Sequence, residues 1–178
     1  MAIEPDTKNW TWVLERPCPE CGFDASTVPA TEVAPLLRAT AAQWAPILAQ
    51  PPDVLRQRPR EDRWSPLEYA CHVRDVFVLF GERLRLMVTE EDPLFANWDQ
   101  DATAVADRYD LAEPAVVAHQ LAEAAEALAA GFDAVDGTAW ERMGRRSDGA
   151  AFTVATFGRY MIHDPIHHLY DVALDAPG

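Results

Sequence analysis

The segment HDPIHHLYDV, residues 163–172, contains three of the five histidines of the chain. On a helix, His163 and His167 would lie on one face, because residues four apart are separated by about one turn. Two imidazoles at this spacing are a common way for one helix to bind a metal ion. His168 points about 100° away from His167 around the helix axis, so we do not expect it to bind the same ion.

A pair of imidazoles needs a further ligand from another part of the chain. His72 is the best candidate, because it interrupts an otherwise apolar helical pattern in EYACHVRDV. A buried ring of this kind needs a polar partner, and a metal ion or a carboxylate would serve. We therefore predict a metal site formed by His72, His163 and His167. The alternative is that the HxxxH spacing arises by chance and that each ring makes an ordinary hydrogen bond.

Two aspartates stand next to these histidines. Asp75 follows His72 by three residues, and Asp164 directly follows His163. In many metal sites a carboxylate accepts a hydrogen bond from the second ring nitrogen of a histidine and so fixes its orientation. We assign Asp75 and Asp164 this supporting role; the competing interpretation places each on a solvated helix face.

Four segments have the periodicity of amphipathic helices that would position these side chains. They span residues 31–50, 65–88, 114–135 and 153–174. The second has the clearest start: Ser65 can cap the helix, Pro66 takes its first position and Glu68 completes a capping box.

The segments between these helices predict the topology. Residues 147–149, SDG, are a turn signal and predict a short hairpin before the last helix. The acidic connector of residues 89–113 is long enough to cross a bundle rather than make a tight turn. We therefore predict an all-α fold, a four-helix bundle with a crossover connection.

Composition excludes several classes of function. The formal net charge of −14 disfavours nucleic-acid binding, which needs a basic surface, and also binding to an anionic membrane. No apolar run approaches the roughly 20 residues that span a bilayer, and the first residues lack a signal pattern. We expect a cytoplasmic protein. The basic side chains are almost all arginine, which is typical of a bacterium with a high-GC genome.

The stretch RPCPECGFDAS contains a CxxC pair, Cys18 and Cys21. It matches half of a zinc-ribbon pattern, but no second CxxC follows, and no βαβ pattern supports a redox role. A surface turn, a redox pair and a metal site completed by a distant histidine all remain open. We divide the chain into an N-terminal extension with this motif, residues 1–28, and a bundle, residues 29–178.

Two stretches, WSPLEYACHVRDV and YMIHDPIHHLYDV, resemble the DinB/YfiT-like superfamily of four-helix-bundle proteins in type, order and separation. The resemblance covers roughly residues 30–175. The family has one histidine on its second helix and HxxxH on its fourth, which correspond to His72, His163 and His167. A difference lies just beyond, where Tyr170 and Asp171 take the place of the family's usual polar residue.

This resemblance implies a divalent metal, usually zinc or nickel, and a thiol-dependent activity. Characterised relatives use mycothiol, bacillithiol or glutathione as S-transferases or isomerases, and in a high-GC bacterium the thiol would be mycothiol. The preferred function is thus transfer of a low-molecular-weight thiol, as a metal-bound thiolate, to an electrophilic small molecule. A homodimer is among the states that the resemblance allows.

Substrate contacts are predicted from charge and aromatic character. An acidic protein that binds an anionic thiol needs local positive charge, and Arg145 and Arg146 precede the metal-binding helix. Phe95 and Trp98 in the connector would roof an apolar pocket. The alternatives are surface charge for the arginines and core packing for the aromatic rings.

Two other functions compete with the enzyme. In one, the metal only braces a non-catalytic, stress-associated bundle. In the other, a bundle without metal binds a partner through an arm that contains Trp10 and Trp12. A metal analysis distinguishes the partner-binding bundle from the two metal-binding proteins. A thiol-consumption assay then distinguishes the enzyme from the non-catalytic bundle.

Overall fold

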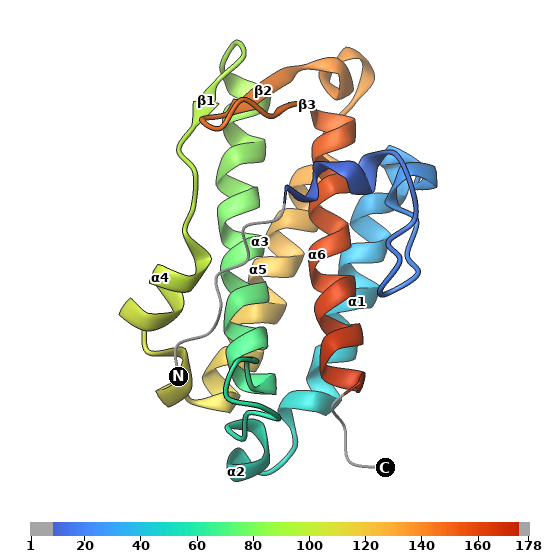
Figure 1. Cartoon of the computed structure of the whole chain (residues 1–178). Coiled ribbons are helices and arrows are strands. Elements are labelled where there is room, and N and C mark those ends of the chain that lie inside the picture. The colour runs from blue at the N-terminus through green and yellow to red at the C-terminus, as the bar shows by residue number, and fades with distance from the viewer. Residues whose placement is uncertain (1–8, 175–178) are drawn as a thin grey trace.

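Four long helices run side by side in the structure, a computed structural model that describes residues 9–174 (Figure 1). They are α1 (Val33–Leu48), α3 (Pro66–Thr89), α5 (Pro114–Asp133) and α6 (Val154–Leu174). Helix α5 packs against α1 and α3, and α6 packs against the same two helices from the other side. The predicted four-helix bundle is confirmed, with bounds within about two residues of the predicted ones.

The crossover lies between α3 and α5. These two helices run in the same direction, so the chain returns along the whole bundle between them (Figure 1). The returning connector contains β1 (Leu94–Phe95), α4 (Gln100–Ala106) and the short 3₁₀ turn η4 (Tyr109–Leu111). A further short helix, α2 (Pro52–Leu55), lies between α1 and α3. The predicted crossover is therefore confirmed.

A small sheet covers the end of the bundle where α3 ends and α6 begins (Figure 1). Strands β2 (Met143–Arg146) and β3 (Ala151–Thr153) form the predicted hairpin, and β1 adds to β2 in parallel. Gly144 allows the sheet to lie close to α3: a Cβ atom there would stand 2.6 Å from the Phe95 ring and 2.7 Å from the Met87 side chain.

Local hydrogen bonds explain where the helices that carry the histidines begin. The Ser65 hydroxyl accepts a hydrogen bond from the Glu68 amide, and the Glu68 carboxylate accepts one from the Ser65 amide at 2.8 Å. This is the predicted capping box. At the start of α6, the Thr153 hydroxyl accepts a hydrogen bond from the Thr156 amide at 3.1 Å.

The bundle interior is filled with large apolar side chains. Trp44, Phe77, Leu121, Phe132 and Phe157 are all fully buried. At burial of this extent each large side chain contributes about 1.5–3 kcal/mol. No helix within residues 9–174 is apolar and long enough to span a membrane.

Residues 9–32 form an N-terminal arm that lies against α6 (Figure 1). It contains the 3₁₀ turns η1 (Trp10–Leu14), η2 (Ala25–Thr27) and η3 (Ala30–Glu32). Arg159 on α6 donates a hydrogen bond to the Val28 carbonyl at 2.7 Å. The arm is therefore packed on the helix that carries the HDPIHHLYDV segment.

Candidate metal centres

Helix α6 presents two pairs of possible ligands. The two members of each pair are four residues apart, and the second pair begins one residue after the first. The first pair, His163 and His167, faces the N-terminal arm. The second pair, Asp164 and His168, faces His72 on α3. One residue of offset turns a helix by about 100°, so one segment contributes to two adjacent clusters.

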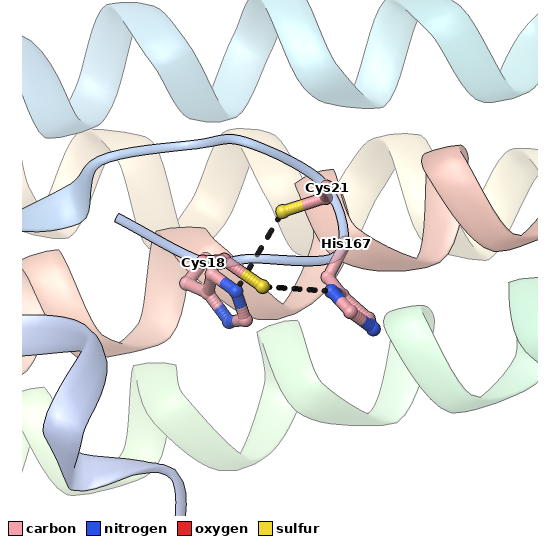
Figure 2. Close-up of side chains that lie close together, drawn as sticks. Cys18, Cys21 and His167 are labelled. Carbon is pink, nitrogen blue, oxygen red and sulfur yellow. Dashed lines mark hydrogen bonds between the residues drawn. The ribbon is translucent and has the colours of Figure 1, made fainter. Parts of the chain in front are cut away.

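We call the first group the Cys/His cluster; it consists of Cys18, Cys21, His163 and His167. One donor atom from each lies within 4.8 Å of the others. Cys18 Sγ is 3.6 Å from His167 Nδ1, and Cys21 Sγ is 3.8 Å from His163 Nε2. Figure 2 shows both thiols on one loop of the arm, with Cys18 directed at the ring of His167.

The rings of the Cys/His cluster are held from several sides. His167 Nε2 lies 3.6 Å from a carboxylate oxygen of Glu20 and 3.7 Å from one of Asp171. The Trp10 ring lies against both imidazoles, with centroid distances of 5.4 Å to His163 and 5.2 Å to His167. The second nitrogen of His167 therefore faces carboxylates, as is usual for a metal-binding histidine.

We call the second group the open cluster; it consists of His72, Asp164 and His168, whose donor atoms also lie within 4.8 Å of one another. His72 Nε2 is 3.4 Å from the Asp164 carboxylate, and His168 Nε2 is 3.8 Å from it. On its other side, His168 Nδ1 is 2.9 Å from Asp171, and Asp171 is bound in turn by Arg63 at 2.8 Å.

The open cluster has one unsatisfied oxygen that fits a cation. Asp164 Oδ1 is buried and makes no hydrogen bond within the described part of the chain, although it lies 3.4 Å from His72 Nε2. A buried carboxylate oxygen without a hydrogen bond costs free energy, and a cation would satisfy it. Oxygen and imidazole donors suit zinc, nickel and other divalent first-row metals.

The electrostatic surroundings suit ligand roles for His163 and Asp164, whereas they keep the Cys21 thiol protonated until an ion displaces its proton. Burial, reinforced by the neighbouring His167, lowers the pKa of His163 to about 4, so its ring is neutral near pH 7 and offers a lone pair. Burial raises the pKa of the Cys21 thiol to about 11. Burial also tends to raise the pKa of Asp164, but the charges of His72 and His168 outweigh it and hold that pKa below its usual range.

A cavity of about 360 Å³ opens beside the open cluster. Its wall includes Asp164 and His168 of the open cluster, His163 and His167 of the Cys/His cluster, Trp98 and Asp101 from the crossover connector, and Trp10 from the arm. The Trp98 ring is stacked on His72, with centroids 5.4 Å apart and planes 9° from parallel. The cavity is large enough for a small molecule.

The structure does not bring the predicted trio of histidines into one group. His163 and His167 lie with the two cysteines of the arm, whereas His72 lies with Asp164 and His168. The reason is the rotation of α6: α3 meets the face of residues 164 and 168. Asp164, predicted to orient a histidine, is itself placed among the possible ligands.

The other predicted residues are divided between the cavity and other parts of the molecule. Arg146 and Trp98 line the cavity. Arg145 is half exposed and pairs with Asp92 at 2.9 Å, and Phe95 is buried in the core at 5 % exposure. The hydrophobic contacts of the sheet hold Phe95 there, against Gly144 and Met87.

Asp75 does not face either cluster. It binds Arg74 at 2.7 Å and accepts a hydrogen bond from the Tyr109 hydroxyl. The carboxylate that supports a histidine is instead Asp171, which the sequence marked only as a difference from the family. Its signal was the spacing of three residues from His168, which places the two on one helix face.

Fold and clusters together define a helical-bundle protein with two candidate metal centres. The chain belongs to the DinB superfamily, whose family model matches residues 36–172, so the predicted family is confirmed. Among solved structures it is similar to YfiT from Bacillus subtilis, described as a probable metal-dependent hydrolase with an unusual four-helix bundle topology. That match has a TM-score of 0.69 and 18 % identity, and covers 97 % of this chain and 91 % of the other. A comparison with curated proteins finds no match.

Proposed function

We propose that this chain is a divalent-metal-dependent enzyme that transfers a low-molecular-weight thiol to an electrophilic small molecule. The observation that carries the proposal is the open cluster, which offers three donors, two of which, Asp164 and His168, line a cavity. Catalytic metal sites differ from structural ones by having few protein ligands and a position left for substrate.

The metal would be held by His72, Asp164 and His168. When bound, a zinc or nickel ion supplies Lewis acidity, which favours the thiolate form of a bound thiol and lowers the pKa of a bound water. The chain's own residues set the geometry: Asp171 orients His168 through Nδ1, and Arg63 holds Asp171 in place.

The cavity wall supplies contacts for substrate. Arg146, fixed by Asp148 and the Tyr160 hydroxyl at 2.9 Å, places positive charge there. That charge suits the carboxylates of bacillithiol or glutathione, whereas mycothiol offers negative charge only at its thiolate. Trp98 supplies an apolar surface and shields His72 from water.

A second candidate function is hydrolysis. The same three donors would serve a metal-dependent hydrolase, the activity for which YfiT is described as a probable case. Thiol transfer and hydrolysis would use the same cavity and differ in whether thiol is consumed.

The test uses purified protein reconstituted with zinc or nickel, with and without a chelator. Each of the three thiols is offered with an electrophile, and free thiol is measured over time. We expect metal-dependent loss of thiol in the wild type and none in His168→Ala. Loss of an ester or amide substrate in the absence of thiol would favour the hydrolase. If neither reaction is observed, the protein is a non-catalytic metal-binding bundle.

His119→Ala is the matched control for these assays. His119 lies on α5, is largely exposed and pairs with Glu123 at 3.1 Å. Its removal deletes an imidazole without touching either cluster, so metal content and thiol consumption should equal those of the wild type.

A further inference from the structure

The N-terminal arm and α6 meet at four side chains that the proposed reaction does not use. We propose that Cys18, Cys21, His163 and His167 form a closed, tetrahedral zinc site that fastens the arm to the bundle. This site is distinct from the open cluster and does not depend on the proposed activity.

The donor set favours zinc. Two thiolates and two imidazoles are a common combination in structural zinc sites, and the C-x₂-C and H-x₃-H spacings are both typical of them. Oxygen-preferring ions such as Mg²⁺ and Ca²⁺ do not suit these ligands. Cys18 and Cys21 are not joined by a disulfide.

The distances agree with a tetrahedron around zinc. With Zn–S of about 2.3 Å and Zn–N of about 2.0–2.1 Å, a tetrahedral site places sulfur and nitrogen about 3.6 Å apart. The observed separations are 3.6 Å for Cys18 Sγ to His167 Nδ1 and 3.8 Å for Cys21 Sγ to His163 Nε2. Two thiol–imidazole hydrogen bonds would explain these pairs separately, but not the convergence of all four donors within 4.8 Å.

The site has four protein ligands, which indicates a structural role. Cys18, His163 and His167 are buried and Cys21 is half-buried, and the two rings also line the cavity. Four protein ligands leave no position for substrate. The loop that carries both sulfurs is closed by two backbone hydrogen bonds: the Gly22 amide donates to the Cys18 carbonyl at 2.9 Å, and the Cys18 amide donates to the Phe23 carbonyl at 2.9 Å.

Zinc at this position would take no part in the proposed reaction and would affect it only by holding the arm in place. It joins Cys18 to His167, which are 149 residues apart in the chain. Trp10 and Glu20, on the same arm, line the cavity. The ion would therefore hold one wall of the cavity in place and fix the rotation of α6 next to the open cluster.

The first experiment measures zinc by elemental analysis after exhaustive dialysis against a mild chelator. The wild type is expected to retain one zinc per chain, and the double variant Cys18→Ser/Cys21→Ser none. Cys71→Ser is the matched control, because Cys71 is the remaining cysteine and lies buried in α3; it should retain the zinc.

The second experiment replaces zinc by Co²⁺ in the wild type, so it does not depend on a variant that folds. A thiolate-to-cobalt charge-transfer band with the visible absorption of a tetrahedral ion is expected, and it should persist in His168→Ala. A cobalt spectrum without the thiolate band would overturn the proposal, as would a double variant that keeps its zinc.

Limited proteolysis reports on the structural role. The double variant should be cleaved within residues 9–32 at least tenfold faster than the wild type, while the bundle stays intact. Equal cleavage of the two proteins would show that the arm is held without zinc. Because His168→Ala removes the proposed activity but not the zinc, failure of one proposal is distinguishable from failure of the other.

Discussion

The Cys/His cluster and the open cluster share one helix but differ in the number and the chemistry of their ligands. The first has four donors, two of them sulfur, and its two imidazoles pack against Trp10 of the arm. The second has three donors, one of them a carboxylate, and lies beside a cavity. Two soft thiolates and two imidazoles complete the coordination of a zinc ion and suit a permanent ion, whereas three ligands leave a position at which an ion can exchange its remaining ligand with substrate.

An offset of one residue along α6 is enough to assign its side chains to two clusters with different proposed roles. His163 and His167 have the same spacing as Asp164 and His168, and one residue of offset turns them toward different neighbours. The partner then decides the role: the arm brings thiols to the first pair, and α3 brings His72 to the second. Asp171 contacts both, at 2.9 Å from His168 and 3.7 Å from His167.

The largest effect is expected from His168→Ala. Loss of one of only three protein donors should remove the metal of the open cluster and lower thiol consumption by more than about 100-fold, beyond the loss caused by changing a supporting residue. The Cys/His cluster should keep its zinc, as measured by elemental analysis after dialysis. Equal loss of metal from both clusters would contradict their independence.

Asp171→Asn should have a smaller and unequal effect. An amide cannot replace a carboxylate as the charged acceptor for His168, so metal affinity at the open cluster should fall by about 10- to 100-fold. The longer contact to His167 predicts a weaker effect on the Cys/His cluster. Competition with a metal indicator measures both affinities.

Asp75→Asn is the control for this change. It alters a carboxylate that binds Arg74 and Tyr109 and faces neither cluster. Its metal affinity should match that of the wild type. If Asp171→Asn weakens both clusters equally, the assignment of Asp171 mainly to His168 is wrong.

The helices were largely predictable because their signals are local. The capping box at Ser65 and Glu68 fixes the start of α3, and apolar periodicity fixes the face that it buries. The hairpin followed from the turn at residues 147–149. Strand β1 was not predicted, because its two residues are too few to form a pattern and it forms only by pairing with β2.

The clusters were less predictable because they depend on how helices are rotated against each other. HxxxH and the overlapping DxxxH have the same period, so sequence alone does not tell which pair faces His72. The contact of Cys18 with His167 spans most of the chain, and only the packed arm reveals it. Phe95 and Trp98 are both aromatic residues of the connector, and the sequence does not distinguish them. In the structure Phe95 is buried under the sheet and Trp98 lines the cavity.

Two tryptophan substitutions compare the clusters: Trp98→Ala tests the open cluster, and Trp10→Ala tests the Cys/His cluster. Removing Trp98 takes away the ring stacked on His72 and part of the cavity wall, so we expect KM to rise several-fold with metal content unchanged. Trp10→Ala also removes part of the cavity wall, but it alone should speed exchange of zinc from the Cys/His cluster. Steady-state kinetics and zinc release to a chelator measure the two effects, and identical behaviour of the variants would remove the distinction.

Ser65→Ala should have the smallest effect on chemistry and separates stability from metal binding. The substitution deletes the hydroxyl that accepts from the Glu68 amide, and loss of such a cap costs about 1 kcal/mol of unfolding free energy. Urea unfolding measures that loss. The cap lies about two turns from His72 and contacts no ligand, so both metals should be retained in full in the folded protein. Loss of metal from the open cluster alone would show that the cap positions His72, and the open cluster would then depend on the start of α3 in a way that the Cys/His cluster does not.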